Sequence, residues 1–307
     1  MKTLSIAKIR EPIVMTLGSF DGIHLGHKSL LELLVVNSKT SNSKSLILSF
    51  EPHPKKVIRP ETKINLLTNF DEKIHIFNEL GIDYFSILEF NKEIANMAFD
   101  EFYEDIIFKN LNIKHIITGF NHEFGRNREG NFDSLKSMCA KRNIEITSVA
   151  PMYYKGSNIS STRIRKSILK GSLAEANEML GHTYFLIGKV VQGKNIGNKI
   201  GFPTANIRII HPDKVIPLNG VYFTKTSVNG NTFWSMTNIG INPTFGDGQV
   251  SIETNIFDFN DDIYDKDIKI SFISRIREEI KFNNANELIE MLKKDHEICL
   301  ELSKKSQ

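Results

Sequence analysis

A glycine-rich turn between an apolar segment and a helical pattern constrains this chain more than any other feature. Residues 13–17 are apolar apart from Thr16, as in a strand that is buried on both faces of a parallel sheet. Residues 18–27 form the turn, and residues 27–34 have the apolar spacing of a helix. A strand, a tight turn and a helix in this order direct backbone N–H groups at a phosphate. The segment predicts an anion site, although an ordinary connection with two surface histidines has the same pattern.

The side chains of this turn favour the anion site. His24 and His27 place two imidazole donors beside the expected helix N-terminus. Gly26 lies between them and removes a Cβ where a flat base could lie against the backbone. These residues predict a site for a nucleotide.

The first part of the chain, residues 1–182, alternates strands with helices. Helices are expected over 70–80, 98–111, 162–170 and 173–180, and strands over 13–17, 45–50, 84–90, 115–119 and 144–149. This alternation predicts a doubly wound parallel sheet, whose ligands gather at the carboxyl ends of the strands.

The second part, residues 183–307, has short β-like segments without intervening helices. They lie at 184–192, 220–228, 232–239, 250–259 and 269–276. Such segments predict a small antiparallel β-barrel, and the apolar face of residues 285–302 predicts a C-terminal helix after it. The expected fold class is therefore α/β for the first domain plus β for the second.

Composition excludes several classes of protein. The chain has 307 residues, enough for two ordinary cores, and its formal net charge of only +3 supplies no field for nucleic acid or a membrane surface. The N-terminus lacks the apolar core of a signal peptide, and no segment has the length of a membrane span. Cys139 and Cys299 lie far apart and predict buried thiols in a reducing compartment. We expect a cytoplasmic protein with small-molecule substrates and no nucleic-acid or membrane partner; the sequence leaves the oligomeric state open.

Three further segments of the first domain carry groups suited to a nucleotide. His53 follows a strand end in a Pro-x-Pro turn, which by itself is also a common strand terminator. Residues 119–130 combine glycines and aromatics with Arg128, whose guanidinium can bind two phosphate oxygens, although a charged surface loop has the same composition. Residues 159–165 open a helix with hydroxyl groups, which an ordinary N-cap explains, and continue with two arginines, which also fit a charged helix face.

The second domain has its own candidate site. A glycine-rich segment with Gly193 and Gly201 leads into Thr204 and Asn206, which point the same way if they lie on a strand. A hydroxyl and an amide oxygen are hard ligands suited to Mg²⁺ bound to phosphates, although this segment alone also fits a simple turn. Glu253 supplies a carboxylate among apolar strand residues, and taken alone it also fits an exposed strand position.

Together these motifs resemble the family of prokaryotic bifunctional riboflavin kinase/FMN adenylyltransferases (FAD synthetases). The motif Gly-x-Phe-Asp-Gly-x-His-x-Gly-His is matched at every fixed position from residue 18 to 27, and Ser-Ser-Thr-x-Ile-Arg is matched from 160 to 165. The Phe-Gly-x-x-Arg-x-Gly element is matched at 124–130. In the second domain the resemblance covers residues 201–206, 220–222, 238–240, Glu253 and 277–282, so it extends over essentially the whole chain.

The resemblance implies a nucleotidyltransferase domain over residues 1–182. It would adenylylate FMN with ATP and release pyrophosphate, with His24, His27 and Arg165 as catalytic groups that hold the triphosphate. The remaining nucleotide contacts of this domain would come from Gly18, Phe20, Gly26, Asn121, Arg128, Ser160, Ser161 and Thr162. In the second domain, Gly193, Gly201, Thr204 and Asn206 would contact the nucleotide.

The resemblance also implies a riboflavin kinase domain over residues 183–307. ATP would phosphorylate riboflavin to FMN, with Glu253 accepting the hydroxyl proton while Thr204 and Asn206 hold Mg²⁺ and ATP. Flavin contacts would come from His53, Asn121 and Arg277. Mg²⁺ is the expected cofactor, ATP the co-substrate, and riboflavin, FMN and FAD the substrates and products.

Some positions depart from the family pattern, and each bears on affinity rather than on a catalytic group. They are His122 for a usual phenylalanine, Asn121 for aspartate, Asn198 for arginine, Asn255 for histidine and Asp265 for glycine. Two alternatives remain: an adenylyltransferase whose barrel binds flavin with little kinase activity, and a flavin- or nucleotide-binding regulator that acts on nucleic acid.

Overall fold

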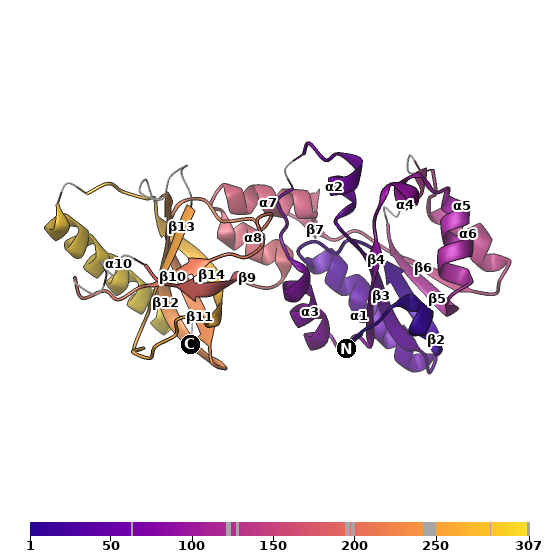
Figure 1. Ribbon diagram of the computed structural model, residues 1–307, viewed down its shortest axis with the longest axis horizontal. Helices are drawn as coiled ribbons and strands as arrows, with labels where there is room; N and C mark the ends of the chain where they lie inside the picture. Colours follow the sequence, from indigo (N-terminus) through magenta and orange to yellow (C-terminus); the bar gives the residue numbers. More distant parts are fainter. Residues whose placement is uncertain are drawn as a thin grey trace. The chain divides into compact units, whose positions relative to one another are not determined.

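The chain forms two compact units, Met1–Ser161 and Thr162–Gln307 (Figure 1). The computed structural model describes residues 1–62, 64–120, 124–126, 129–193, 197, 200–241, 250–282 and 284–305. Within these ranges, no helix has both the length and the apolar character that crossing a membrane requires.

The first unit is built on a six-stranded parallel sheet with the order β1-β4-β3-β2-β5-β6. The strands are β1 (Lys2–Thr3), β2 (Pro12–Leu17), β3 (Lys44–Glu51), β4 (Tyr84–Glu89), β5 (Asn112–Gly119) and β6 (Glu145–Val149). Beyond β2 the chain adds β3 and β4 on one side and then β5 and β6 on the other. The strand order therefore reverses beside β2, and ligands of such sheets bind in the crevice at that point.

Helices cover both faces of this sheet (Figure 1). On one face lie α1 (Leu25–Thr40) and α3 (Phe70–Glu79), and Phe77 of α3 meets Phe85 of β4 edge to face at 5.2 Å. On the other face, Met15 and Leu48 share a buried cluster with Phe102 and Leu135, which lie on η2 (Phe102–Phe108) and α6 (Phe132–Ala140). Successive side chains of β2 thus serve opposite faces, which explains its mostly apolar sequence.

The predicted strands and long helices of this unit are confirmed, with one change and several additions. The helix expected over 98–111 is a short α5 (Phe99–Glu101) that continues as the π-helix η2. The sequence did not predict helix α6 or the short elements, which are β1, η1 (Ile6–Lys8), α2 (Pro54–Ile58), α4 (Lys92–Asn96), β7 (Tyr153–Tyr154) and β8 (Ser157–Asn158).

The second unit contains a closed antiparallel barrel with the strand order β10-β13-β12-β11-β14-β9. Its strands are β9 (Tyr184–Val191), β10 (Ala205–Arg208), β11 (Gly220–Val228), β12 (Asn231–Ile241), β13 (Val250–Ile256) and β14 (Asp267–Arg277). Five were predicted. The sixth, β10, pairs with both β9 and β13 and so closes the barrel.

Hydroxyl groups fill part of the barrel interior. Thr224, Ser235, Thr237 and Thr254 are fully buried and hydrogen-bonded to one another: Thr224 Oγ1 lies 2.8 Å from both Ser235 Oγ and Thr237 Oγ1, and Thr237 Oγ1 lies 2.9 Å from Thr254 Oγ1. Because each hydroxyl both donates and accepts, the row satisfies its own polar atoms without water.

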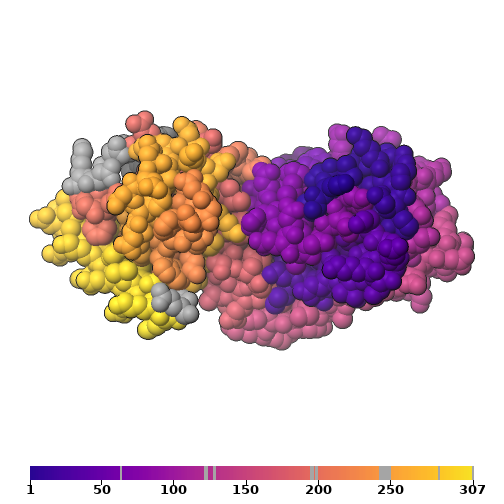
Figure 2. Space-filling model, turned by 90° about the horizontal axis from the view of Figure 1, so that it is seen from below, coloured from indigo at the N-terminus to yellow at the C-terminus, as the bar shows by residue number. Residues whose placement is uncertain are grey.

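The last helix, α10 (Ala285–Lys305), packs against the outside of the barrel. Its Cys299 belongs to a buried cluster with Val221, Phe223 and Met236, and Figure 2 shows the helix in yellow along the orange barrel. Both cysteines are free and buried, as predicted, and burial raises the pKa of the Cys299 thiol to about 12.

Helices α7 (Ser161–Leu169) and α8 (Leu173–Leu180) lie almost entirely in the second unit. Asn177 of α8 holds two barrel strands: its Nδ2 donates to Phe272 O at 2.9 Å, and its Oδ1 accepts from the N–H of Tyr184 at 2.7 Å. The boundary between the two compact units falls between residues 161 and 162. A functional boundary at residue 182 stays a prediction.

Asn177→Ala should destabilise the second unit by about 1–3 kcal/mol, because it leaves a buried donor and acceptor of β14 and β9 without partners. Urea denaturation measures the change. Glu178→Ala removes an exposed side chain of the same helix and serves as the control. Equal stability of the two variants would contradict this role.

Candidate active sites

The backbone of the turn between β2 and α1 is strained. Phe20 has a φ of +47° and Ile23 a φ of +42°, a region that residues with large or branched side chains rarely adopt. Such strain persists only where surrounding contacts fix the backbone, and it is concentrated at functional sites.

Asp21 supplies those contacts. Its side chain is buried, and Oδ1 accepts hydrogen bonds from the N–H groups of Leu67 at 2.8 Å and Thr68 at 3.0 Å. Thr68 Oγ1 in turn accepts from the N–H of Gly22 at 2.9 Å. Ser161 Oγ, one of the predicted hydroxyls, donates to the carbonyl oxygen of Asp21 at 2.8 Å. The turn, the segment before α3 and the start of α7 are thus joined at one residue.

The two histidines of the turn lie against each other. His24 is the N-cap of α1, and its Nδ1 accepts from the backbone N–H of His27 at 3.3 Å. The two rings stack with centroids 3.7 Å apart. Because Nδ1 of His24 is an acceptor, the neutral ring carries its proton on Nε2 and keeps that N–H as a donor for a ligand. A Cβ on Gly26 would lie 3.3 Å from this ring, so glycine leaves the ring its space.

Burial controls the charge of this pair. It lowers the pKa of His24 to about 4, against a smaller opposing effect of the Asp21 carboxylate. Burial also lowers the pKa of His27, and the neighbouring His24 and Lys73 lower it further. Both rings are therefore neutral at pH 7, and they offer an anion N–H groups rather than full positive charges.

Other predicted residues of the first site follow the same sheet edge. The N–H of Gly18 donates to Leu48 O at 3.1 Å and extends the pairing of β2 with β3. His53 caps α2, with its Nδ1 accepting from the N–H of Lys55 at 3.2 Å. His24 and His53 follow neighbouring parallel strands, so both lie at the carboxyl edge.

The structure leaves four predicted features of this site untested. Asn121, His122 and Arg128 lie outside the described residues. Ser160 and Ser161 end the first unit, whereas Thr162 and Arg165 belong to the second, so the position of Arg165 against the histidines stays a prediction.

The second unit brings Thr204, Asn206 and Glu253 together at the junction of β10 and β13. Thr204 Oγ1 lies 3.4 Å from Glu253 Oε2, and Asn206 is directly opposite Glu253 in the strand register. Gly193 leaves room for the side chain of Asn206, because a Cβ at that position would lie 1.9 Å from Asn206 Nδ2. Gly201 has a φ of +81°, which suits the tight turn before Thr204.

Asn255, one of the departures from the family pattern, contributes to this arrangement. Its Nδ2 donates to Pro203 O at 2.6 Å, so it fixes the peptide that carries Thr204. Asp265 has a φ of +60°, a conformation that aspartate tolerates better than most residues, which accounts for its fit where the family usually has glycine. Asn198 lies outside the described residues.

A cavity of about 270 Å³ lies between the barrel and α10. Its walls are mostly apolar: Ile200, Phe202, Val221, Met236, Ile280, Phe282, Leu288 and Leu292. Its polar lining includes Thr204, Asn238, Glu253, Asn255 and Glu279. Arg277 also lines it, but Asp295 holds the guanidinium: Nε lies 3.0 Å from both carboxylate oxygens and Nη2 lies 2.7 Å from Oδ2. Asp295 is only 1% exposed, so this ion pair fixes α10 as a wall of the cavity.

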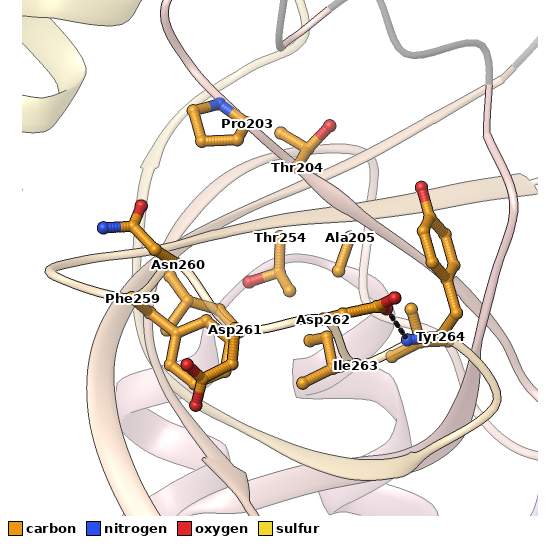
Figure 3. A pocket seen from close by; sticks show the side chains of 12 residues that line it. Pro203, Thr204, Ala205, Thr254, Phe259, Asn260, Asp261, Asp262, Ile263 and Tyr264 are labelled. Atoms are coloured by element: carbon orange, nitrogen blue, oxygen red, sulfur yellow. Dashed lines mark hydrogen bonds between the residues drawn. The ribbon is translucent and has the colours of Figure 1, made fainter.

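A second cavity, of about 400 Å³, opens on the other side of Thr204. Figure 3 shows Pro203 and Thr204 on one side of it and residues 259–264 on the other. Asp262 Oδ1 accepts from the backbone N–H of Tyr264 at 3.0 Å, which shapes this segment. Thr204 lines both cavities, so its hydroxyl lies where their contents would meet.

Sequence reasoning missed the residues that hold these sites in shape. Asp21 was visible only as a motif position, and Asp295 only as an acid on an amphipathic helix. The apolar face with Leu288 and Leu292 was predicted, and its use as a cavity wall was not. The strand predicted over 250–259 ends at Ile256 in the structure, so Phe259 lies beyond β13.

His24→Asn should reduce the acid sensitivity of folding while keeping an N-cap acceptor. The folded-state pKa is about 4 against an ordinary 6.5, so the unfolded chain binds more protons between these values. Stability therefore falls as the pH drops through this window and is unaffected by His24 above it. We expect the loss in unfolding free energy from pH 6.5 to pH 4 to be smaller in the variant by about 3 kcal/mol.

Urea denaturation across this pH range measures the difference, with His75→Asn as the control because its imidazole is exposed. The same loss in His24→Asn and the unaltered protein would show that His24 is not a buried neutral ring.

Each half of the chain matches a known protein family. The model of the FAD synthetase family matches residues 6–163, and that of the riboflavin kinase family matches residues 180–303. A crystal structure from Streptococcus pneumoniae, described as a macrolide-efflux protein, has a TM-score of 0.88 and 30% identity, and the match covers 97% of this chain and 98% of that one.

Curated relatives match along most of their length. The bifunctional riboflavin kinase/FMN adenylyltransferase of Listeria monocytogenes is 36% identical over 286 residues, which cover 92% of this chain and 90% of the relative. The protein of the same name from Bacillus subtilis is 35% identical over 292 residues, with coverage of 92% and 90%. The chain therefore belongs to the family of bifunctional riboflavin kinase/FMN adenylyltransferases.

Proposed function

We propose that this protein phosphorylates riboflavin to FMN in its second unit and adenylylates FMN to FAD in its first, with ATP as the donor in both reactions. The observation that carries the proposal is the presence of two separate polar centres in one chain. One is the stacked histidine pair at the N-terminus of α1, and the other is the Thr204–Glu253 contact between two cavities.

Adenylyl transfer is an in-line attack of the FMN phosphate on the α-phosphorus of ATP, with pyrophosphate as the leaving group. It needs no covalent intermediate, so the protein has to position two anions and stabilise the charge on their oxygens. In support, the N–H groups at the start of α1 and the Nε2 of His24 form a donor set beside a strained, firmly held turn. Arg165, Ser160 and Thr162 would close over the outer phosphates, and Asn121 and His53 would contact the flavin nucleotide.

The kinase reaction transfers the γ-phosphoryl group of ATP to the terminal hydroxyl of the riboflavin side chain. We place the flavin ring in the cavity beside α10, because a flat apolar ring suits its apolar walls. The nucleotide would then occupy the cavity of residues 259–264, and the γ-phosphate would reach the flavin hydroxyl beside Thr204. Glu253 would accept the proton of that hydroxyl.

The donor set at this junction fits Mg²⁺. A threonine hydroxyl, an asparagine carbonyl and one carboxylate are hard oxygen ligands, and Mg²⁺ usually takes few protein ligands beside phosphates and water. Thr204 and Asn206 would hold the ion, which when bound neutralises charge on the phosphates of ATP.

For Arg277 we propose a positioning role with respect to the flavin. Its Nε and Nη2 bind Asp295, and its Nη1 donates to Glu278 O at 2.8 Å. The guanidinium therefore keeps α10 and the end of β14 in place around the flavin cavity.

Two buried free thiols support a cytoplasmic location, which cell fractionation checks.

His27→Ala should lower FAD formation by at least about 100-fold, because it removes a preorganised donor from the charged transition state. FMN formation should remain, since the second unit performs it. Separation of flavins over time, with riboflavin, ATP and magnesium as the only inputs, measures both activities, and His75→Ala is the exposed control. Normal FAD formation by His27→Ala would refute the first site.

Glu253→Gln should lower FMN formation from riboflavin by about 100- to 10,000-fold, the usual contribution of a general base. FAD formation from supplied FMN should be unchanged. Glu290→Gln alters an exposed glutamate of α10 and is the matched control. Near-normal riboflavin turnover by Glu253→Gln would remove Glu253 from the chemistry.

A further inference from the structure

Lys73 is a buried lysine that neither proposed reaction uses. It lies on α3 and is 7% exposed. Among the residues that the structure describes, no acceptor lies within hydrogen-bond distance of its ammonium group and no carboxylate within ion-pair distance. Lysine side chains are seldom buried to this degree, because moving a charge out of water is costly. The position therefore suits an anion bound at the neighbouring turn.

The same face of α3 that carries Lys73 is packed on the histidine turn. Phe77 lies one helical turn after Lys73, so both side chains share a face of the helix. Phe77 meets the ring of Phe20 at 6.1 Å, and Phe20 meets the ring of His27 at 5.2 Å, both edge to face. This row of three rings places the face of α3 with Lys73 toward the turn.

The start of α3 is held to the same turn. The N–H groups of Leu67 and Thr68, which precede the N-cap Asn69, both bind the carboxylate of Asp21. Lys73 follows the N-cap by four residues. With α3 held at its first turn and again at Phe77, Lys73 has little freedom to move out to solvent.

The charges around Lys73 leave it under-compensated. Burial lowers its pKa, and the carboxylates of Asp21 and Glu51 act in the opposite direction. The Asp21 carboxylate is already engaged by two backbone N–H groups. His24 and His27 are neutral and bring no positive charge of their own. Lys73 would offer a full positive charge to an anion that bound at the turn.

We propose that Lys73 is a phosphate-binding residue of the adenylyl-transfer site, where its ammonium group binds an oxygen of the triphosphate beside His27. The inference rests on the proposed function of the turn and adds a residue to it. A fixed ammonium group stabilises the negative charge that builds up on the departing pyrophosphate, which neutral imidazoles do less strongly.

Lys73→Met removes the charge and keeps an apolar stem of similar length. We expect it to lower kcat/KM for FAD formation by about 100-fold and to weaken the binding of inorganic pyrophosphate at least about tenfold, the range for a charged hydrogen bond. Lys73→Arg keeps the charge and should lose less of both. Lys39→Met makes the same change at an exposed position of α1 and serves as the control.

Stopped assays of FAD formation and titration calorimetry with pyrophosphate provide the two measurements, and thermal unfolding provides a third. A phosphate-binding role predicts an unchanged or raised unfolding temperature for Lys73→Met, because the described residues form no direct hydrogen bond or ion pair with the ammonium group that the substitution would break, and a methionine side chain is less costly to bury. A lowered unfolding temperature with pyrophosphate affinity within about threefold of the unaltered protein would overturn the proposal, since a charged hydrogen bond contributes more than that.

His27→Ala separates this inference from the function on which it rests. If His27→Ala abolishes FAD formation while Lys73→Met does not change it, Lys73 is not a phosphate ligand and the site stands. If both variants leave FAD formation and pyrophosphate binding unchanged, the adenylyl-transfer site itself is wrongly placed.

Discussion

The first site depends on the hydrogen bonds of one buried carboxylate. Asp21 joins the strained turn to the segment before α3 through its side chain, and to Ser161 through its carbonyl oxygen. Those bonds help to hold Phe20 and Ile23 at positive φ beside the stacked imidazole pair. The chemistry proposed for the turn therefore relies on a residue to which neither reaction assigns a chemical step.

Much of the fold was predictable because burial leaves a clear signal in the sequence. Strands covered on both faces of the parallel sheet have mostly apolar sequences. The barrel strand β11, which lies between turn residues, was predicted with the bounds that the structure has. Short elements gave no such signal: β10 has four residues and forms only because β9 and β13 offer free edges on both sides of it. Helix α8 packs with the second unit through hydrogen bonds of Asn177 to residues far away in the sequence, and no local sequence pattern reveals such contacts.

The candidate sites were predictable in their reacting groups and not in their supports. His24, Thr204 and Glu253 stand in motifs whose spacing reflects the chemistry. The ion pair of Arg277 with Asp295 joins a strand to a helix, and a sequence does not reveal which acid will meet which base. Lys73 was hidden for a related reason, since a lysine on an amphipathic helix ordinarily belongs to its exposed face.

Thr204 belongs to the walls of both cavities of the second unit, and the peptide before it is held by Asn255. A ligand that displaces this residue from one side changes the space offered on the other. Thermodynamic linkage makes such an effect mutual. If a ligand in one cavity changes the affinity for a ligand in the other, the second ligand changes the affinity for the first by the same factor. Thr204 is therefore the residue through which occupants of the two cavities would be energetically coupled.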